Sequence, residues 1–299
     1  MQAIQTAIKI QNSAKAIVWR KIQQRRLSSY LNSDRRPWRE GYQEYKDDYL
    51  RKTIADQSIM KIFRDGNELP PSYGMRLDAR VIEIPWVLAR LEDRPGNLLD
   101  AGSALNHEYV LRSLTNQKIT ITTLAPEGDA YWRLGVSYVF GDLRDLDFRD
   151  GRFDSVACIS TIEHIGMDNS MYAGAADIAK RGDPKEFLLA VAELKRVLKP
   201  SGVLYITFPF GRYENHGWFQ QFDSALMDRL IQGFDPTESR ESIFKYEAAG
   251  WRLSNRDDCA QAEFFDVHTS KYLDANSTIE YPPDYPAGER ALACLELRT

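Results

Sequence analysis

The chain has 299 residues, of which 43% are hydrophobic and 27% are charged, and its formal net charge is −4. These values are ordinary for a globular protein, so they exclude a wholly disordered chain and a fibrous repeat. The acidic balance excludes a protein whose whole surface attracts nucleic acid, and we expect no nucleic-acid partner. The cysteines Cys158, Cys259 and Cys294 lie far apart, which argues against a disulfide framework or a cysteine-rich zinc site.

The first 33 residues contain six lysines and arginines and no acidic residue. Apolar residues recur there at near-helical spacing, at Ile4, Ala7, Ile8, Ala14, Ile17, Val18 and Ile22. This pattern predicts a basic amphipathic helix. Its apolar side has two alternative partners: an anionic membrane surface, or apolar surface of its own domain or of a second subunit in a homo-oligomer. Because no apolar run approaches a spanning helix or a signal peptide, we expect a cytoplasmic protein, with peripheral contact at the inner membrane face as the alternative.

Residues 34–75 mix aromatic and charged side chains and end in a Pro-Pro-Ser-Tyr-Gly turn, which indicates a helical hairpin followed by a loop. From residue 77, helical and strand-like stretches alternate, and the clearest helix is predicted over Lys185–Lys199. The predicted strands cover residues 98–101, 119–123, 138–140, 153–160, 203–208, 251–255 and 291–297. Such alternation is typical of an α/β fold with a mostly parallel sheet. We therefore expect a helical N-terminal cap over residues 1–76 and a second domain over residues 77–299.

The first predicted strand runs into a turn of small residues, Asp100-Ala101-Gly102-Ser103. A nicotinamide cofactor would require G-x-G-x-x-G at this turn, and only one glycine is present. Four further motifs follow in chain order: Gly141-Asp142-Leu143, Leu146 to Asp154, Ile159 to Ile165 with its Glu163-His164 pair, and Glu193 to Gly202. Together the five motifs resemble those of class I S-adenosylmethionine-dependent methyltransferases. The resemblance implies a Rossmann-like sheet of seven strands, mostly parallel, with helices on both faces and the last strand antiparallel.

The resemblance also implies S-adenosylmethionine as the cofactor and assigns residues to it. Asp100 and Gly102 would bind the methionine end, Asp142 the adenine amino group, and Ser160 would lie beside the sulfonium. The chain departs from the family pattern at two places. Ala104 and Asn106 replace later glycines, although Asn tolerates a left-handed backbone. The complete set of expected cofactor-binding residues is Asp100, Gly102, Ser103, Asn106, Thr123, Glu127, Asp142, Leu143 and Ser160.

The second departure concerns the acid that the family usually places on the ribose at the end of the second strand. Thr123 stands there instead, and Glu127 follows four residues later. Glu127 is therefore either the ribose ligand or a solvated loop carboxylate.

Methylation of a hydroxyl requires a base that takes up the proton of the acceptor. His164 is the candidate base because it follows the fourth predicted strand, and Glu163 would orient it or contact the cofactor. The alternative is that His164 is a structural member of its loop. The spacing of histidines argues against a transition-metal site, so we expect no metal, although nearby carboxylates leave a magnesium ion open.

The loop after the fifth predicted strand is rich in aromatic and polar residues, which suit a sugar or a flat ring. Its alternative role is a hydrophobic plug. Expected substrate-binding residues are Asn169, Tyr172, Tyr213, His216 and Trp218.

Several segments, among them Arg80 to Trp86, resemble methyltransferases of bacterial surface-polysaccharide biosynthesis. This implies a small-molecule acceptor: a sugar hydroxyl or amine on a nucleotide or lipid carrier. Three alternatives remain open: a methyltransferase of secondary metabolism, a nicotinamide oxidoreductase, and a non-enzymatic cofactor-binding protein.

Overall fold

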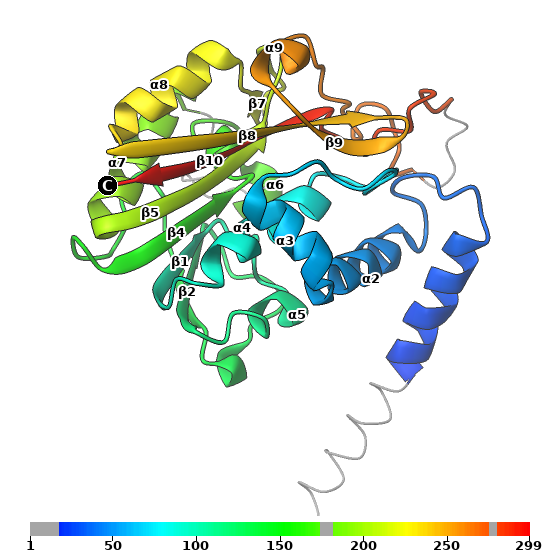
Figure 1. The fold of residues 1–299 in the computed structure, drawn as a ribbon, viewed down its shortest axis with the longest axis horizontal. Coiled ribbons are helices and arrows are strands. Elements are labelled where there is room, and N and C mark those ends of the chain that lie inside the picture. Colours follow the sequence, from blue (N-terminus) through cyan, green and yellow to red (C-terminus); the bar gives the residue numbers. More distant parts are fainter. Residues whose placement is uncertain (1–17, 174–181, 275–279) are drawn as a thin grey trace, which may run out of the picture.

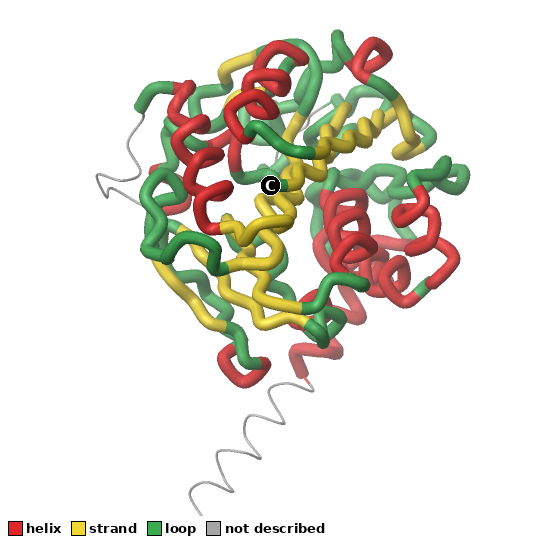
Figure 2. The backbone as a smooth tube through the Cα atoms, turned by 60° about the vertical axis from the view of Figure 1, so that its left-hand side comes forward, coloured by secondary structure: helices red, strands yellow, loops and turns green. Residues whose placement is uncertain are grey.

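One large sheet organises the molecule, with helices on both of its faces (Figures 1 and 2). The computed structural model describes residues 18–173, 182–274 and 280–299. The sheet has eight strands in the order β3-β2-β1-β4-β5-β10-β8-β9. Their bounds are β1 Gly96–Ala101, β2 Gln117–Thr123, β3 Ser137–Phe140, β4 Phe153–Ile159, β5 Leu198–Pro209, β8 Glu238–Glu247, β9 Gly250–Ser254 and β10 Ala291–Arg298.

The strands β1 to β5 are parallel, and β10 pairs antiparallel with both β5 and β8. The Rossmann-like α/β fold with an antiparallel last strand is therefore confirmed. The predicted number of seven strands is wrong, because β8 is an additional strand. Its first four residues are polar and exposed, which hides the strand pattern. The segment predicted over 251–255 is β9, which forms an antiparallel hairpin with β8 at the edge of the sheet.

Alternate residues along the strands belong to two separate hydrophobic cores, one on each face of the sheet. On β5, Val203 and Tyr205 belong to the core that also contains α4 (Arg80–Leu91), whereas Leu204 and Ile206 face α7 (Phe187–Val197) and α8 (Ser224–Phe234). This period of two is what a strand buried on both faces requires. The predicted helix Lys185–Lys199 is shorter in the structure, because β5 begins at Leu198. The 3₁₀ turn η4 (Pro184–Glu186) precedes it.

The expected helical hairpin consists of α2 (Tyr42–Ala55) and α3 (Gln57–Asp65). Asp56 caps α3 by accepting hydrogen bonds from the amides of Ser58 and Ile59 at 2.9 and 3.3 Å. Both helices pack on α4 and share its core (Figure 1). The boundary between residues 76 and 77 remains a prediction.

Residues 18–31 form a further helix, and Val18, Trp19 and Ile22 on it are exposed. These three side chains are not buried by the protein's own domain, whereas Tyr30 near the end of the same helix is 2% exposed. The predicted apolar positions from Ile4 to Ile17 lie outside the described residues. Among the described helices, none is long and apolar enough to cross a membrane.

The remaining short elements connect the larger ones. They are the helices α5 (Glu108–Leu111), α6 (Ser170–Ala173) and α9 (Arg256–Cys259), the 3₁₀ turns η1 (Trp132–Leu134) and η2 (Ile162–His164), and the two-residue strands β6 (Glu214–Asn215) and β7 (Gln220–Gln221).

Candidate active site

A pocket of about 530 Å³ opens at the edge of the sheet where the parallel strands end. Gly102, Leu124, Gly141 and Ser160 directly follow β1, β2, β3 and β4, Pro209 ends β5, and all five line the pocket. β1 lies between β2 and β4, so the order of strands reverses at this point of the sheet. Open α/β sheets bind their ligands in the crevice at such a reversal.

The turn after β1 has a left-handed backbone, with φ of 113° at Gly102 and 68° at Ser103. A side chain at Gly102 would collide with the Thr161 hydroxyl, so glycine is required there. Asn106, expected to replace a left-handed glycine, is not among the residues with positive φ. The Ser103 hydroxyl is buried and has no hydrogen-bond partner among the described residues, although the residue lines the pocket. The turn is therefore a cradle that offers an unpaired polar group to a ligand.

Asn106 acts through its side chain. Its Nδ2 donates to Glu127 Oε2 at 2.9 Å, and its Oδ1 accepts from the Tyr138 hydroxyl at 2.8 Å. The amide thereby ties the turn after β1 to the loop after β2. Thr123 and Glu127 both line the pocket, so this tie holds the Glu127 carboxylate at its wall.

Three expected cofactor ligands do not line the pocket: Asn106, which acts as described above, Asp100 and Asp142. Asp100 is fully buried beneath the turn, where its Oδ2 accepts from the Leu105 amide at 2.9 Å. Burial raises the pKa of Asp100 to about 7. The Asp142 carboxylate accepts from Arg144 Nε at 2.9 and 3.1 Å, and Arg144 also pairs with Glu186. Leu143, next to Asp142, does line the pocket.

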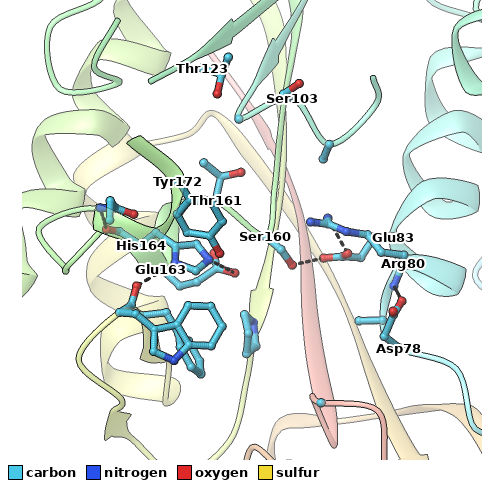
Figure 3. Close-up of a pocket in the computed structure, with 18 of the residues that line it drawn as sticks. Asp78, Arg80, Glu83, Ser103, Thr123, Ser160, Thr161, Glu163, His164 and Tyr172 are labelled. Atoms are coloured by element: carbon cyan, nitrogen blue, oxygen red, sulfur yellow. Dashed lines mark hydrogen bonds and ion pairs between the residues drawn. The ribbon is translucent and has the colours of Figure 1, made fainter. Parts of the chain in front are cut away.

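His164 and Glu163 lie on η2, just after β4, and both line the pocket (Figure 3). His164 Nδ1 is 2.9 Å from the carbonyl oxygen of Trp218. A carbonyl can only accept, so Nδ1 carries the proton and Nε2 has the free lone pair. Burial lowers the pKa of His164 to about 4, which keeps the ring neutral at pH 7.

Glu163 is 2% exposed, and its Oε1 lies 4.0 Å from His164 Nε2. Its other oxygen, Oε2, has no hydrogen-bond partner in the described part of the chain. Burial raises the pKa of Glu163 well above its usual range. The carboxyl group therefore has unused hydrogen-bonding capacity in a wall of the pocket.

Three of the five expected acceptor residues line the pocket. Trp218 and Tyr172 place their rings 5.3 and 5.4 Å from that of His164. Asn169 supports the same loop by donating from Nδ2 to the His164 carbonyl at 2.8 Å.

Tyr213 and His216 are not in the wall of the pocket. Tyr213 is exposed ahead of the small ribbon formed by β6 and β7. The ring of His216 stacks on that of Phe219, which does line the pocket, with centroids 4.5 Å apart.

The wall opposite His164 comes from residues for which no role was expected (Figure 3). Lys46 of α2 pairs with Asp78 at 2.6 Å, and both side chains are nearly buried. Arg80 pairs with Glu83 at 3.0 Å. For this wall, the sequence signal was limited to Arg80 and Glu83, which stand one helical turn apart in the segment Arg80 to Trp86.

Glu83 joins three elements at the base of this wall. It is 1% exposed and accepts hydrogen bonds from the Ser160 hydroxyl after β4, from Thr207 Oγ1 of β5 at 2.5 Å, and from Arg80 of α4. Ser160 has a left-handed backbone with φ of 38°, which this carboxylate holds in place.

The long connection between β9 and β10 covers the remaining side of the pocket. Its residues in the wall are Phe264, Val267, His268, Ala287, Gly288 and Glu289. Trp38, from the N-terminal segment, donates to the Ala287 carbonyl at 2.7 Å and also lines the pocket. Segments from both ends of the chain therefore close the site. In the described residues, no group of three or more His, Cys, Asp or Glu side chains is arranged to hold a metal ion.

Comparison with known proteins identifies the domain around this pocket. Residues 99–206 match the sequence model of a family described as "Methyltransferase domain". None of the curated proteins matches the chain. The matched segment contains the turn after β1, the ends of β2, β3 and β4, and the Glu163-His164 pair.

Several solved structures are similar at low identity. The 1,6-didemethyltoxoflavin-N1-methyltransferase of Burkholderia thailandensis, solved with S-adenosylhomocysteine, is 17% identical, with a TM-score of 0.44 over 85% of this chain and 89% of that one. The N-methyltransferase NodS of Bradyrhizobium japonicum, also solved with S-adenosylhomocysteine, is 12% identical, with a TM-score of 0.40 over 84% and 97%. The YcgJ protein of a Bacillus species is 11% identical, with a TM-score of 0.43 over 73% and 98%.

The pocket fits the cofactor of such a domain, because the cradle after β1 leaves a buried hydroxyl unpaired and the loop after β2 presents a carboxylate beside it. With the family match over residues 99–206, the protein is an enzyme that contains an S-adenosylmethionine-dependent methyltransferase domain.

Proposed function

We propose that the turn after β1 and the loop after β2 bind the cofactor. Gly102 permits the close backbone approach, the Ser103 hydroxyl takes up a polar partner, and Glu127, held by Asn106, accepts from the ribose hydroxyls. Thr123 and Leu143 line the same part of the pocket, and Ser160 lies at the end of β4. Bound S-adenosylmethionine supplies a methyl group activated by a sulfonium.

Asp100 and Asp142 act on this site in a different way. Asp100 holds the turn through the Leu105 amide. Asp142 must share its carboxylate between Arg144 and an adenine amino group. Asp100 therefore acts on the cofactor only through the turn, and Asp142 can bind the cofactor only in competition with Arg144. Glu127, in contrast, would bind the ribose directly.

His164 Nε2 is the base that takes up the proton of the acceptor. The observation that carries this role is the hydrogen bond from Nδ1 to the Trp218 carbonyl, which fixes both the tautomer and the ring plane. Glu163 contributes a second polar group beside Nε2. A lone pair fixed in this way in the wall of the pocket supports the proposed role of His164 as the base.

The acceptor is a small polar molecule, and we propose a sugar hydroxyl or amine on a nucleotide or lipid carrier in glycan biosynthesis. The wall combines the aromatic faces of Trp38, Trp218 and Phe264 with polar side chains, a combination that suits a sugar. A small apolar acceptor would leave those polar groups without partners.

Transfer of a radiolabelled methyl group tests this function directly. The purified protein would be supplied with labelled S-adenosylmethionine and with nucleotide sugars, amino sugars and matched aromatic alcohols and amines. We expect label in at least one sugar acceptor, and transfer at least about a hundredfold slower in the His164→Ala variant. Cofactor binding without label in any sugar would remove the glycan proposal and leave the methyltransferase domain standing.

We further propose that the N-terminal helix brings the enzyme to an anionic membrane, at the inner membrane face of the cell. Arg20, Lys21 and Arg25 lie on the same helical segment as the exposed Val18, Trp19 and Ile22. A helix with an apolar side and several cations suits a lipid surface. A homo-oligomer in which a second copy covers this side is the alternative.

A further inference from the structure

Besides Glu127, four acids line the pocket, and they outnumber the permanent cations there: Asp78, Glu83, Glu163 and Glu289. Two permanent cations, Lys46 and Arg80, line the same part of the pocket. Each cation already has its own carboxylate, since Lys46 pairs with Asp78 at 2.6 Å and Arg80 pairs with Glu83 at 3.0 Å.

The carboxyl groups of Glu163 and Glu289 are left over. Glu163 is 2% exposed, and its Oε2 has no hydrogen-bond partner among the described residues. Glu289 forms no ion pair with any residue that the structure describes, and it lies on the last turn of the connection before β10. A buried carboxyl oxygen without a partner, such as Glu163 Oε2, costs free energy, which a bound cation would recover.

Three aromatic residues line the pocket together with these two carboxyl groups. Tyr172, Trp218 and Phe264 all line the pocket on the side of His164. The face of an aromatic ring attracts an ammonium group, and most strongly where water is excluded. Aromatic faces together with unpaired carboxyl groups favour a cation over a neutral hydroxyl.

Besides burial, the charges of neighbouring acids raise the pKa values of Glu163 and Glu289. Burial, followed by the charges of Asp78 and Glu83, raises the pKa of Glu289 to about 7. Burial raises the pKa of Glu163 well above its usual range, and the Glu83 and Glu289 charges add to the rise. The direction of both shifts indicates that further negative charge is unfavourable here, which a cationic ligand would offset.

We propose that the acceptor is a primary or secondary amine, bound as its ammonium ion by Glu163 and Glu289, so that the enzyme is an N-methyltransferase. This rests on the proposed function and names its acceptor class. The ammonium ion gives one proton to His164 Nε2, which frees the nitrogen lone pair. The new N–C bond forms as the C–S bond of the cofactor breaks, and the electron pair of that bond stays on sulfur. The products are a methylated ammonium ion and a neutral thioether, and the proton on His164 passes to water.

Binding of a matched pair of probes, 2-phenylethylamine and 2-phenylethanol, tests this proposal. Calorimetry at pH 7.5, with the protein saturated with S-adenosylhomocysteine, gives both dissociation constants. We expect the amine to bind at least about tenfold more tightly than the alcohol. The Glu289→Gln variant should lose most of this preference, and Glu289→Lys should reverse it. Glu289 is only partly buried, so both variants should fold.

Glu263→Gln is the matched control. It makes the same substitution in the same connection, where Glu263 is exposed, pairs with Arg212 at 2.8 Å and does not line the pocket. Its amine preference should equal that of the wild type. Equal binding of amine and alcohol, or no binding of either, would overturn the proposal.

Three further outcomes separate this proposal from the proposed function. If Glu289→Gln weakens S-adenosylhomocysteine binding and leaves the amine preference unchanged, the carboxyl group serves the cofactor and the amine proposal fails. If labelled methyl reaches alcohols and depends on His164, the amine proposal fails while the proposed function stands. If labelled methyl reaches no acceptor although the amine binds, the proposed function fails instead.

Discussion

The Nδ1 atom of His164 lies 2.9 Å from the carbonyl oxygen of Trp218, across 54 residues of sequence. This one contact fixes the tautomer of the histidine, orients its ring and leaves Nε2 as an acceptor. It also connects the end of β4 with the loop after β5, so a change in either loop would turn the ring.

Replacement of His164 by alanine should lower kcat by roughly 10² to 10⁴ while the affinity for S-adenosylmethionine stays nearly the same. The reason is that the proton of the acceptor loses its base, whereas the cradle after β1 is untouched. Steady-state kinetics and calorimetry measure the two quantities separately. Added imidazole should restore part of the rate if His164 takes up a proton. Unfolding of the variant, or unchanged kcat, would count against the assignment.

Replacement of Gly102 by alanine should weaken cofactor binding by roughly tenfold or more, because the new side chain meets the Thr161 hydroxyl and the backbone has φ of 113°. Gly141→Ala is the matched control, since Gly141 lines the same pocket and a side chain there would meet nothing within 4 Å. Its dissociation constant should change by less than about twofold. If both substitutions changed the dissociation constant of the cofactor equally, the close contact between Gly102 and Thr161 would not be what cofactor binding requires. Calorimetric titration with S-adenosylhomocysteine distinguishes these outcomes.

Asp100 should make folding stability depend on pH. Its pKa is raised in the folded state from 3.8 to about 7, so its favourable contribution is complete below pH 3.8 and is lost as pH rises through about 7. The loss amounts to at most about 4 kcal/mol, at 1.36 kcal/mol per pKa unit. Asn can still accept from the Leu105 amide without ionising. Asp100→Asn should therefore be more stable than the wild type at about pH 8.5, and its advantage should shrink towards about pH 5.

Urea unfolding of the two proteins without cofactor at both pH values measures that difference. The comparison between variant and wild type cancels the titration of all other groups. A difference in unfolding free energy that does not change with pH would show that Asp100 is ionised in the folded protein.

Substitution of Arg20, Lys21 and Arg25 by glutamine should abolish binding to anionic vesicles. Each cation near such a surface contributes on the order of 1 kcal/mol, and salt screens the attraction. Sedimentation with anionic and neutral vesicles, at low and high salt, is the measurement. The control removes three exposed cations elsewhere, at Lys118, Lys185 and Arg229, and should bind as the wild type does. A wild-type protein that ignores vesicles and forms oligomers through this helix would favour the alternative of a second subunit.

The sequence by itself determined the local features on which the fold depends. The period of two in strands such as β5, and the single glycine in the turn after β1, each follow from interactions within a few residues. The strand β8 was not predicted, because its first half is exposed and polar and shows no strand pattern. Its pairing with β10 and β9 is what makes this segment a strand. Asn106 was expected to adopt a left-handed backbone in the turn. Its side chain instead donates a hydrogen bond to Glu127, which lies 21 residues further along the chain.

Only the tertiary structure decided what faces the pocket. Asp100 stands in a motif yet lies beneath the turn, because the carboxylate accepts from the Leu105 amide. Lys46 carries no sequence signal, but α2 packs on α4 and places its ammonium group beside Asp78. Glu289 reaches the site from the last loop of the chain. Hydrophobic periodicity is a property of neighbouring residues and can be read from the sequence, whereas the charges around a ligand are set by contacts between distant segments, which only folding brings together.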